Sequence, residues 1–180
     1  IGLLPGGGGL TYIARRAAEN AQLAVGADLL AFLKEPFTSA AMAKVATSAV
    51  ESRKLGYLLD SDTIVAHKDE LLFVAAAQAR TLYDCGYRPP LRRLIAVAGR
   101  SASATIKASL VAMRDGGFVS QHDFHIGSLI GEIICGGDVD AGTLVNEDYL
   151  MALERKHFCA LLEHPKTQER IMGTVSYTHL

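Results

Sequence analysis

The sequence predicts a mainly α-helical fold, and three observations support this. Apolar residues recur at intervals of three and four along several stretches, the spacing that gathers them on one face of a helix. Residues that favour helix starts or ends flank these stretches. Only one short run, Thr63-Ile64-Val65, has the β-branched, apolar character of a strand. We therefore expect helices joined by turns, with one strand-like segment.

Four short helices are expected in the first third of the chain, over residues 10–25, 28–34, 38–45 and 49–55. Gly26 ends the first, because glycine readily adopts the left-handed conformation that closes a helix. The second should end before Pro36, since proline disfavours the helical conformation in the residue before it. Ser48 is a good cap for the fourth helix.

Five more helices are expected after an irregular connector, over residues 69–85, 102–114, 120–135, 146–163 and 165–173. The first has apolar residues at helical spacing and stops at Gly86. Asn146 is a good cap, and Pro165 suits a first helical turn. Residues 88–99 break the helical pattern and should be extended or irregular.

Composition is that of an ordinary globular protein, with 49% hydrophobic and 21% charged residues. A formal net charge of -1 gives no general attraction to nucleic acid or anionic lipid, and no apolar run is long enough to span a membrane. Three widely spaced cysteines, Cys85, Cys135 and Cys159, predict reduced and buried thiols in a cytoplasmic protein.

Both ends of the chain have unusual sequences. The apolar residues 1–4, followed by Pro5 and four glycines, are typical of a buried strand that enters a turn, so we expect truncation at the N-terminus. The C-terminal letters VSYTHL resemble the translation of a sequencing adapter. We expect residues 174–180 to be a non-native tail that packs on nothing.

The glycine turn, Gly6 to Gly9, is the most prominent motif. Backbone N–H groups at such a turn can hold phosphate when it opens a helix. The sequence lacks a Walker motif, however, and Thr11 stands where a dinucleotide fingerprint needs its third glycine. The alternative is a tight turn that lets a helix pack closely.

Two polar clusters are weaker candidates. His122, Asp123 and His125 have a spacing that metal ligands can adopt, but Ser120 and Asp123 also suit a helix cap, and we expect no metal. His67, His157 and His164 should be isolated and exposed. The second cluster is basic and consists of Arg88, Arg92, Arg93 and Arg100. It forms either a solvated connector or a contact for an anionic ligand or a partner domain. Asp138 and Asp140 should form a turn.

Several motifs resemble known families. Residues 1–9 resemble the crotonase (enoyl-CoA hydratase/isomerase) family, in which a Gly-Leu-x-Pro-Gly-x-Gly segment enters a helix: IGLLPGGGG. Residues 48–58 and 62–65 are similar to the helix and short strand that follow in that family. Further segments resemble the C-terminal end of bacterial enzymes that fuse a 3-hydroxyacyl-CoA dehydrogenase to a crotonase domain: GYRPP, VAGR, MRDGGFVSQHD, CGGDV and PKTQER.

The resemblance implies the back half of a crotonase-type α/β (ββα spiral) domain over residues 1–87, and a helical C-terminal region over residues 88–173. It implies fatty-acid β-oxidation, in which an enoyl-CoA is hydrated and the 3-hydroxyacyl-CoA is oxidised by NAD. The NAD site and the catalytic glutamates would lie upstream, so no catalytic residue is expected in this chain. The implied partners are an acyl-CoA substrate, the upstream dehydrogenase domain and a second copy of the protein.

The resemblance also assigns one substrate-binding segment. Pro5, Gly6, Gly7 and Gly8 correspond to the turn that borders the acyl-CoA pocket in the family. Coenzyme A would then enter as part of the substrate. Two alternatives stay open: a non-catalytic helical interaction module, with residues 120–163 as its surface, and a nucleotide-binding domain that uses the glycine turn.

Overall fold

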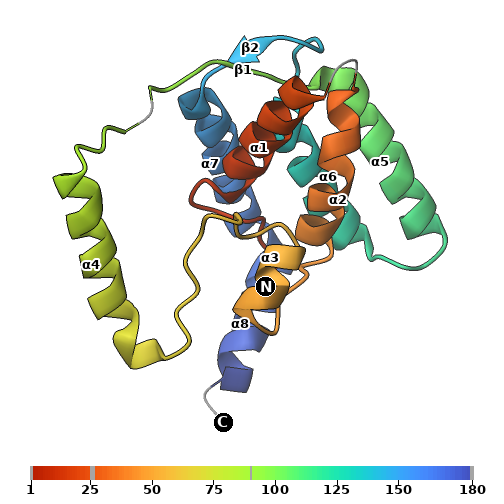
Figure 1. Cartoon of the computed structure of the whole chain (residues 1–180). Helices are drawn as coiled ribbons and strands as arrows, with labels where there is room; N and C mark the ends of the chain where they lie inside the picture. Colours follow the sequence, from red (N-terminus) through yellow and green to blue (C-terminus); the bar gives the residue numbers. More distant parts are fainter. Residues whose placement is uncertain (1, 25–26, 90, 179–180) are drawn as a thin grey trace. The chain divides into compact units, whose positions relative to one another are not determined.

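The computed structural model describes residues 2–24, 27–89 and 91–178. The chain forms two compact units, one made of residues 1–44 and 93–180 and the other of residues 45–92. Figure 1 shows the helices of both. None of the helices in the described part is both long and apolar enough to cross a membrane.

The larger unit is a helical bundle with one short two-stranded ladder. Its helices are α1 (Gly9–Leu23), α2 (Leu29–Ala41), α5 (Gly99–Asp115), α6 (Gln121–Ile134), α7 (Glu147–Leu162) and α8 (Pro165–Thr178). Strand β1 (Ile95–Ala96) pairs antiparallel with β2 (Leu144–Val145), with Ile95 opposite Val145. The smaller unit contains α3 (Ala49–Lys54), the 3-10 turn η1 (Lys68–Glu70) and α4 (Leu71–Asp84).

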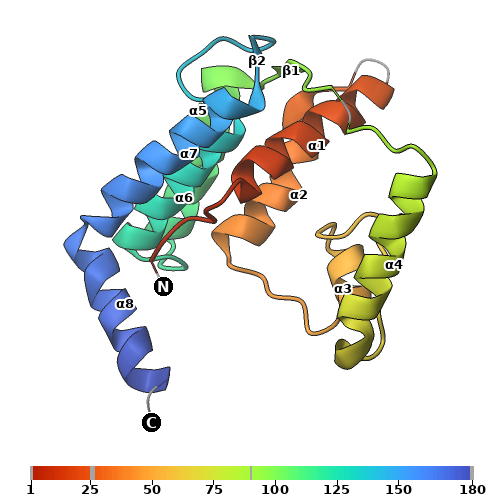
Figure 2. The same ribbon diagram turned by 90° about the vertical axis from the view of Figure 1, so that its left-hand side faces the viewer.

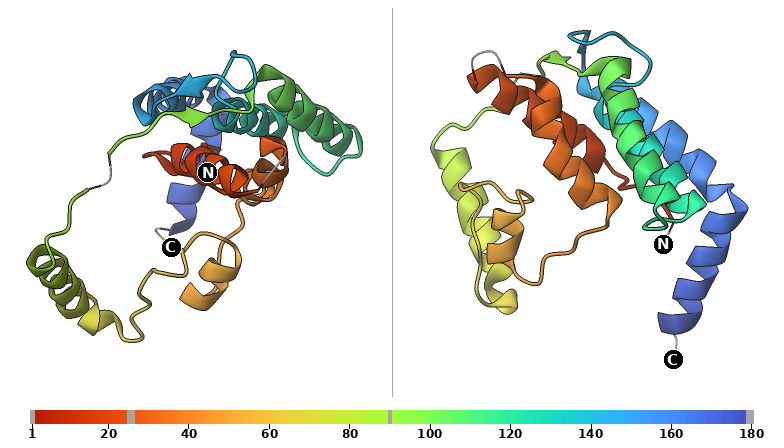
Figure 3. Two further views of the ribbon diagram at one scale, coloured as in Figure 1. Left: turned by 45° about the horizontal axis from the view of Figure 1, so that its top comes forward. Right: turned by 90° about the vertical axis from the view of Figure 1, so that its right-hand side faces the viewer.

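Helix α6 is the centre of the larger unit and contacts α1, α2, α5 and α7. Figure 2 shows α5, α6 and α7 side by side. Ile130, Ile133 and Ile134 of α6 are almost completely buried, so this helix supplies much of the core. In Figure 3 the α5 ribbon, drawn in green, lies along the teal ribbon of α6.

Two glycines allow α5 and α6 to approach closely. A Cβ atom at Gly127 would lie 3.1 Å from Leu110 Cδ1, and one at Gly131 would lie 2.9 Å from Ile106 Cγ2. Glycine is unfavourable inside a helix because of its backbone entropy. At these positions that cost is offset by apolar packing against the buried side chains Ile106 and Leu110.

Two loops are held together beside the ladder. The N–H groups of Gly99 and Arg100 donate to the carbonyls of Cys135 and Val139, both at 2.8 Å. Gly99 has a φ of 74°, and a Cβ atom there would lie 2.4 Å from the Ala141 nitrogen. A side chain at position 99 would therefore break this junction.

Three predicted N-terminal caps are confirmed and two helix boundaries are wrong, whereas the predicted helix stop at Gly26 lies outside the described residues. Ser48, Ser120 and Asn146 each accept a hydrogen bond from the first turn of the following helix. Helix α2, however, runs through Pro36 to Ala41 instead of stopping before it, and no separate helix covers residues 38–45. Leu33 and Phe37 flank Pro36 and are both buried, so tertiary packing outweighs the local effect of proline.

The strand prediction is also wrong. Residues 63–65 have no regular structure, whereas the ladder lies at residues 95–96 and 144–145, the first of which falls in the expected irregular connector. A strand requires partners for its backbone groups, and β propensity alone cannot supply them.

The cysteine and tail predictions have mixed outcomes. Cys135 is buried, and burial raises the pKa of its thiol to about 12, but Cys85 and Cys159 are exposed. Helix α8 continues to Thr178, so most of the expected tail is helical. Residues 174–176 are exposed, whereas the Tyr177 side chain lies outside the described part of the chain.

Candidate functional site

The glycine turn leads directly into the first helix. Gly7 and Gly8 have φ angles of 70° and 93°, in the left-handed region that favours glycine. Gly8 is the cap residue of α1 and has no side chain with which to cap it. The N–H groups of the first turn therefore need an acceptor from elsewhere in the chain.

That acceptor is the carboxylate of Glu154, in the middle of α7. Its Oε1 accepts from the Gly8 N–H at 2.8 Å. Its Oε2 accepts from the N–H and the hydroxyl of Thr11, at 3.2 Å and 3.1 Å. Glu154 is only 3% exposed. A buried negative charge is thus compensated by three donors and by the positive end of the α1 dipole.

This geometry separates the two interpretations of the turn. A bound phosphate would use the N–H groups at the start of α1, but Glu154 already occupies those of Gly8 and Thr11. The structure therefore disfavours a nucleotide-phosphate site there. The other side of the turn is open: Pro5, Gly6 and Gly7 are exposed, and no heavy atom lies within 4 Å of a Cβ placed at Gly7.

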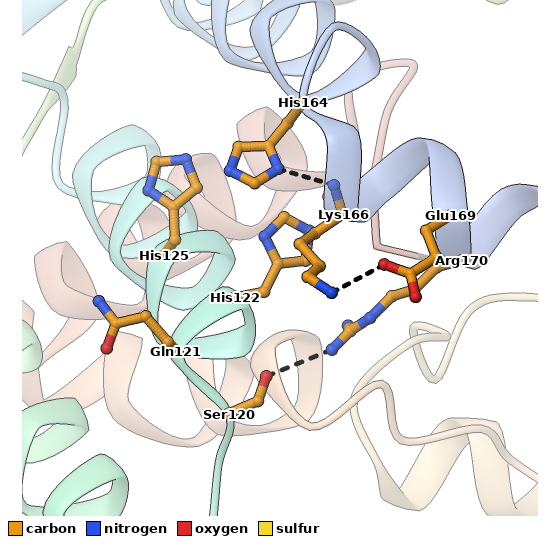
Figure 4. Close-up of a pocket in the computed structure, with 8 residues that line it drawn as sticks. All are labelled: Ser120, Gln121, His122, His125, His164, Lys166, Glu169 and Arg170. Carbon is orange, nitrogen blue, oxygen red and sulfur yellow. Dashed lines mark hydrogen bonds and ion pairs between the residues drawn. The ribbon is translucent and has the colours of Figure 1, made fainter.

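A second candidate site is a pocket of about 780 Å³ between the start of α6 and the α7–α8 junction. We call it the histidine pocket, and Figure 4 shows its eight residues: Ser120, Gln121, His122, His125, His164, Lys166, Glu169 and Arg170. The centroids of the His122 and His164 rings are 4.5 Å apart, and that of His125 is 6.3 Å and 5.7 Å from them. The prediction that His164 is isolated is therefore wrong.

Hydrogen bonds fix the tautomer of His122. The fully buried Thr167 hydroxyl donates its one proton to the Gly2 carbonyl at 2.8 Å, because that carbonyl can only accept. The same hydroxyl lies 3.0 Å from His122 Nε2 and must accept there, so Nε2 carries the proton. His122 Nδ1 is then an acceptor, and it is buried without a hydrogen-bond partner among the described residues.

The acidic residue next to His122 has a structural role. Asp123 forms the predicted capping box with Ser120 and accepts from Arg170 Nη1 at 2.6 Å. The hydrogen bond from Arg170 is the largest cause that lowers the Asp123 pKa to about 2. Among the residues described, no cluster of three or more His, Cys, Asp or Glu is arranged to hold a metal ion.

Two imidazoles of the pocket, those of His122 and His125, have a lowered pKa. Burial, followed by the neighbouring charge of His164, lowers the pKa of both His122 and His125. Arg170 also lowers the pKa of His122, whereas Asp123 raises it. His157, expected to be exposed, is instead buried and bonds Glu132 at 3.1 Å. His122 and His125 therefore gain a proton less readily than an ordinary exposed histidine.

The basic cluster and the predicted turn meet at one residue. Arg100 pairs with Asp138 at 3.2 Å and with Asp140 at 3.5 Å, both through exposed side chains. Arg93 lies in the same unit, whereas Arg88 and Arg92 belong to the smaller one. The structure accordingly gives Arg100 a role in holding the turn between α6 and β2.

Sequence reasoning missed the residues that complete both sites. Glu154 lies 146 residues from Gly8, and Thr167 lies 165 residues from Gly2. Glu154 stands in no motif, and although Thr167 lies within the PKTQER segment, nothing there marks its hydroxyl as a partner of distant residues. Only the tertiary structure identifies them.

Comparison with known proteins gives one relative. The chain is 36% identical over 171 residues to a Bacillus subtilis protein described as "Probable 3-hydroxyacyl-CoA dehydrogenase". The match covers 95% of this chain but only 21% of the relative, so the chain spans about a fifth of that protein's length. No family model matches the chain. No solved structure matches it either.

Proposed function

We propose that this chain is part of a longer enzyme of fatty-acid β-oxidation that acts on acyl-CoA thioesters. The observation that carries the proposal is 36% identity, over nearly the whole chain, to a protein whose name states 3-hydroxyacyl-CoA dehydrogenase activity. In the longer protein NAD would be the oxidant, bound outside this segment. The chain itself would contribute packing and one border of a substrate site.

We further propose that the longer protein hydrates enoyl-CoA in a crotonase-type domain. Residues 1–9 carry the motif that supports this, and the exposed face of Pro5, Gly6 and Gly7 is consistent with a turn that a thioester approaches. Gly8 would contribute indirectly, since its N–H is held by Glu154. We propose that residues 1–87 are the back half of the crotonase-type domain and residues 88–173 a helical C-terminal region. Residues 174–180 would be a non-native tail.

Activity measurements on two proteins test the proposal. The full-length protein should oxidise a 3-hydroxyacyl-CoA with NAD and should hydrate crotonyl-CoA. The 180-residue chain alone should do neither, because no catalytic residue is assigned to it. A full-length protein that lacks dehydrogenase activity would refute the first proposal, and one that oxidises but does not hydrate would refute only the second. Hydration by the chain alone would contradict the assignment of catalytic residues upstream.

The alternative of a helical interaction module is less well supported. The surface considered for it was residues 120–163, but α6 lies at the centre of its own unit and is largely buried. Helix α6 therefore cannot contribute much of that surface to a partner, which leaves the exposed face of α7.

A further inference from the structure

The histidine pocket has a lining suited to an anion. Its side chains include three imidazoles, Lys166 and Arg170, and its one carboxylate belongs to Glu169. Glu169 pairs with Lys166 at 2.8 Å, but both side chains are more than 60% exposed, at 68% and 64%. An exposed pair of this kind is weak, so a more strongly charged ligand can replace Glu169 beside Lys166.

His122 indicates which kind of anion fits. The residue is 7% exposed, and its Nδ1 lacks a hydrogen-bond partner in the described part of the protein. A buried acceptor in that state costs free energy, and natural structures contain few of them. A ligand that completes the pocket must therefore either donate a hydrogen bond to neutral Nδ1 or accept one from protonated Nδ1.

A phosphate monoester can do both, because its second pKa is about 6. As a monoanion its P–OH group donates to neutral Nδ1, and as a dianion its oxygen accepts from protonated Nδ1–H. The two complexes, monoanion with neutral imidazole and dianion with protonated imidazole, contain the same number of protons and differ only in which partner holds the shared one. A carboxylate is fully ionised at pH 7 and offers no such donor.

We propose that the histidine pocket is a binding site for a phosphate monoester, with His122, His125 and Lys166 as its principal contacts. His122 Nδ1 is itself shielded from solvent, so the ligand reaches it, directly or through one bridging water, after a small movement of the side chains that cover it. Arg170 keeps its bonds to Asp123 and Ser120 and contributes positive charge at the edge of the pocket. The proposal is independent of the acyl-CoA function.

The pH dependence of binding follows from this chemistry. At pH 8 the free ligand is a dianion and His122, whose pKa is lowered, is neutral, so formation of the complex takes up one proton. Affinity should therefore rise as pH falls from 8 to about 6.5, where free phosphate itself gains a proton. A bound anion also offsets the repulsion from His164 and Arg170 that lowers the His122 pKa.

The test is a titration of the 180-residue chain with inorganic phosphate, followed through the imidazole resonances in NMR and by calorimetry in two buffers of different ionisation enthalpy. We expect the resonances of His122 and His125 to move and the apparent heat to depend on the buffer at pH 8. His125→Gln and Lys166→Met should each weaken binding about tenfold, as expected for loss of one hydrogen bond to a charged group.

Matched controls are His67→Gln and Lys107→Met, at exposed positions outside the pocket. Both should bind phosphate like the parent chain. His125 and Lys166 are exposed, so at pH 8 their variants should keep the parent's thermal midpoint and far-ultraviolet spectrum. The proposal is overturned if phosphate causes no shift in the pocket histidines, if the pocket and control variants behave alike, or if affinity does not increase between pH 8 and 6.5.

A second comparison distinguishes the source of the phosphate. Coenzyme A carries a 3′-phosphate monoester, whereas dephospho-coenzyme A lacks it. If coenzyme A shifts the pocket histidines and the dephospho form does not, the ligand is the cofactor's monoester. If only inorganic phosphate binds, the pocket takes a small free phosphate, and the assignment to a monoester is wrong.

Discussion

At the scale of single residues, Glu154 connects the last third of the chain to the start of the first helix. Its carboxylate is the acceptor for Gly8 and for both donors of Thr11. A glycine at the cap position leaves these donors without a local partner. The stability of α1 should therefore depend on a residue in α7.

We predict that Glu154→Ala lowers the free energy of unfolding by about 2–4 kcal/mol, because it leaves three donors without an acceptor near a helix start. Urea unfolding measures the difference. The matched control is Glu163→Ala, at an exposed glutamate that follows α7, which should change stability by less than about 0.5 kcal/mol. Equal losses in the two variants would show that Glu154 does not support α1.

A second residue-scale prediction concerns the open side of the turn. If the proposed hydratase activity is correct, Gly7→Val should lower hydration by the longer protein more than it lowers stability. The left-handed conformation costs a side chain about 1–2 kcal/mol, and the added Cβ meets no heavy atom within 4 Å inside this chain. Rates with crotonyl-CoA and with a 3-hydroxyacyl-CoA provide the comparison, and the dehydrogenase rate should stay unchanged. If Gly7→Val leaves hydration intact while Arg88→Ala abolishes it, the basic residues are the functional element.

At the scale of elements, the contact between α5 and α6 depends on small residues at one face. We predict that Gly131→Ala lowers stability by about 1–3 kcal/mol, because the new methyl group would overlap Ile106. Gly173→Ala in α8 should instead raise stability by about 0.5–1 kcal/mol, since that position is open and alanine favours helix. Thermal or urea unfolding of both variants measures the two signs. A gain at both positions would mean that α5 and α6 are less closely packed than described.

The attachment of α8 to α6 should depend on pH. Folding lowers the pKa of His122 and His125, so the unfolded chain binds more protons and stability falls as pH drops below about 6.5, the ordinary histidine value. Asp123, with its pKa lowered to about 2, adds a second loss below the ordinary value of 3.8. Unfolding midpoints from pH 8 to pH 3 in phosphate-free buffer should show both steps. His125→Gln should reduce the upper step, and His67→Gln should leave it unchanged.

Local signals predicted much of the helical structure and little of the two sites. Ser48, Ser120 and Asn146 act within three residues of their partners, so the sequence alone was sufficient to identify them. The helix end before Pro36 was wrongly predicted because burial of Leu33 and Phe37 outweighs the local effect of proline. The strand at residues 63–65 was wrongly predicted because strands form where a partner is available, as at residues 95 and 145. The glycine turn was visible in the sequence, whereas Glu154 and the meeting of His122 with His164 depend on distant segments.

At the scale of the whole molecule, the larger unit is completed by contacts between its two ends. The carbonyl of Gly2 accepts from Thr167, and the N–H of Gly8 donates to Glu154. These partners are separated by 165 and 146 residues, and residues 45–92 lie between them in sequence as a separate unit. Contacts of such high sequence separation slow folding, because a long loop must close before they form.

This closure has a consequence for synthesis on the ribosome. Helix α1 is made before α7, so its N-terminal N–H groups wait for a glutamate that is made more than 140 residues later. At about 5–20 residues per second, the delay lasts on the order of ten seconds. During that interval α1 lacks its acceptor and α2 lacks the apolar surface of α6. This segment of the newly made protein should therefore be most vulnerable to proteases and chaperones around α1 and α2, until α7 is complete.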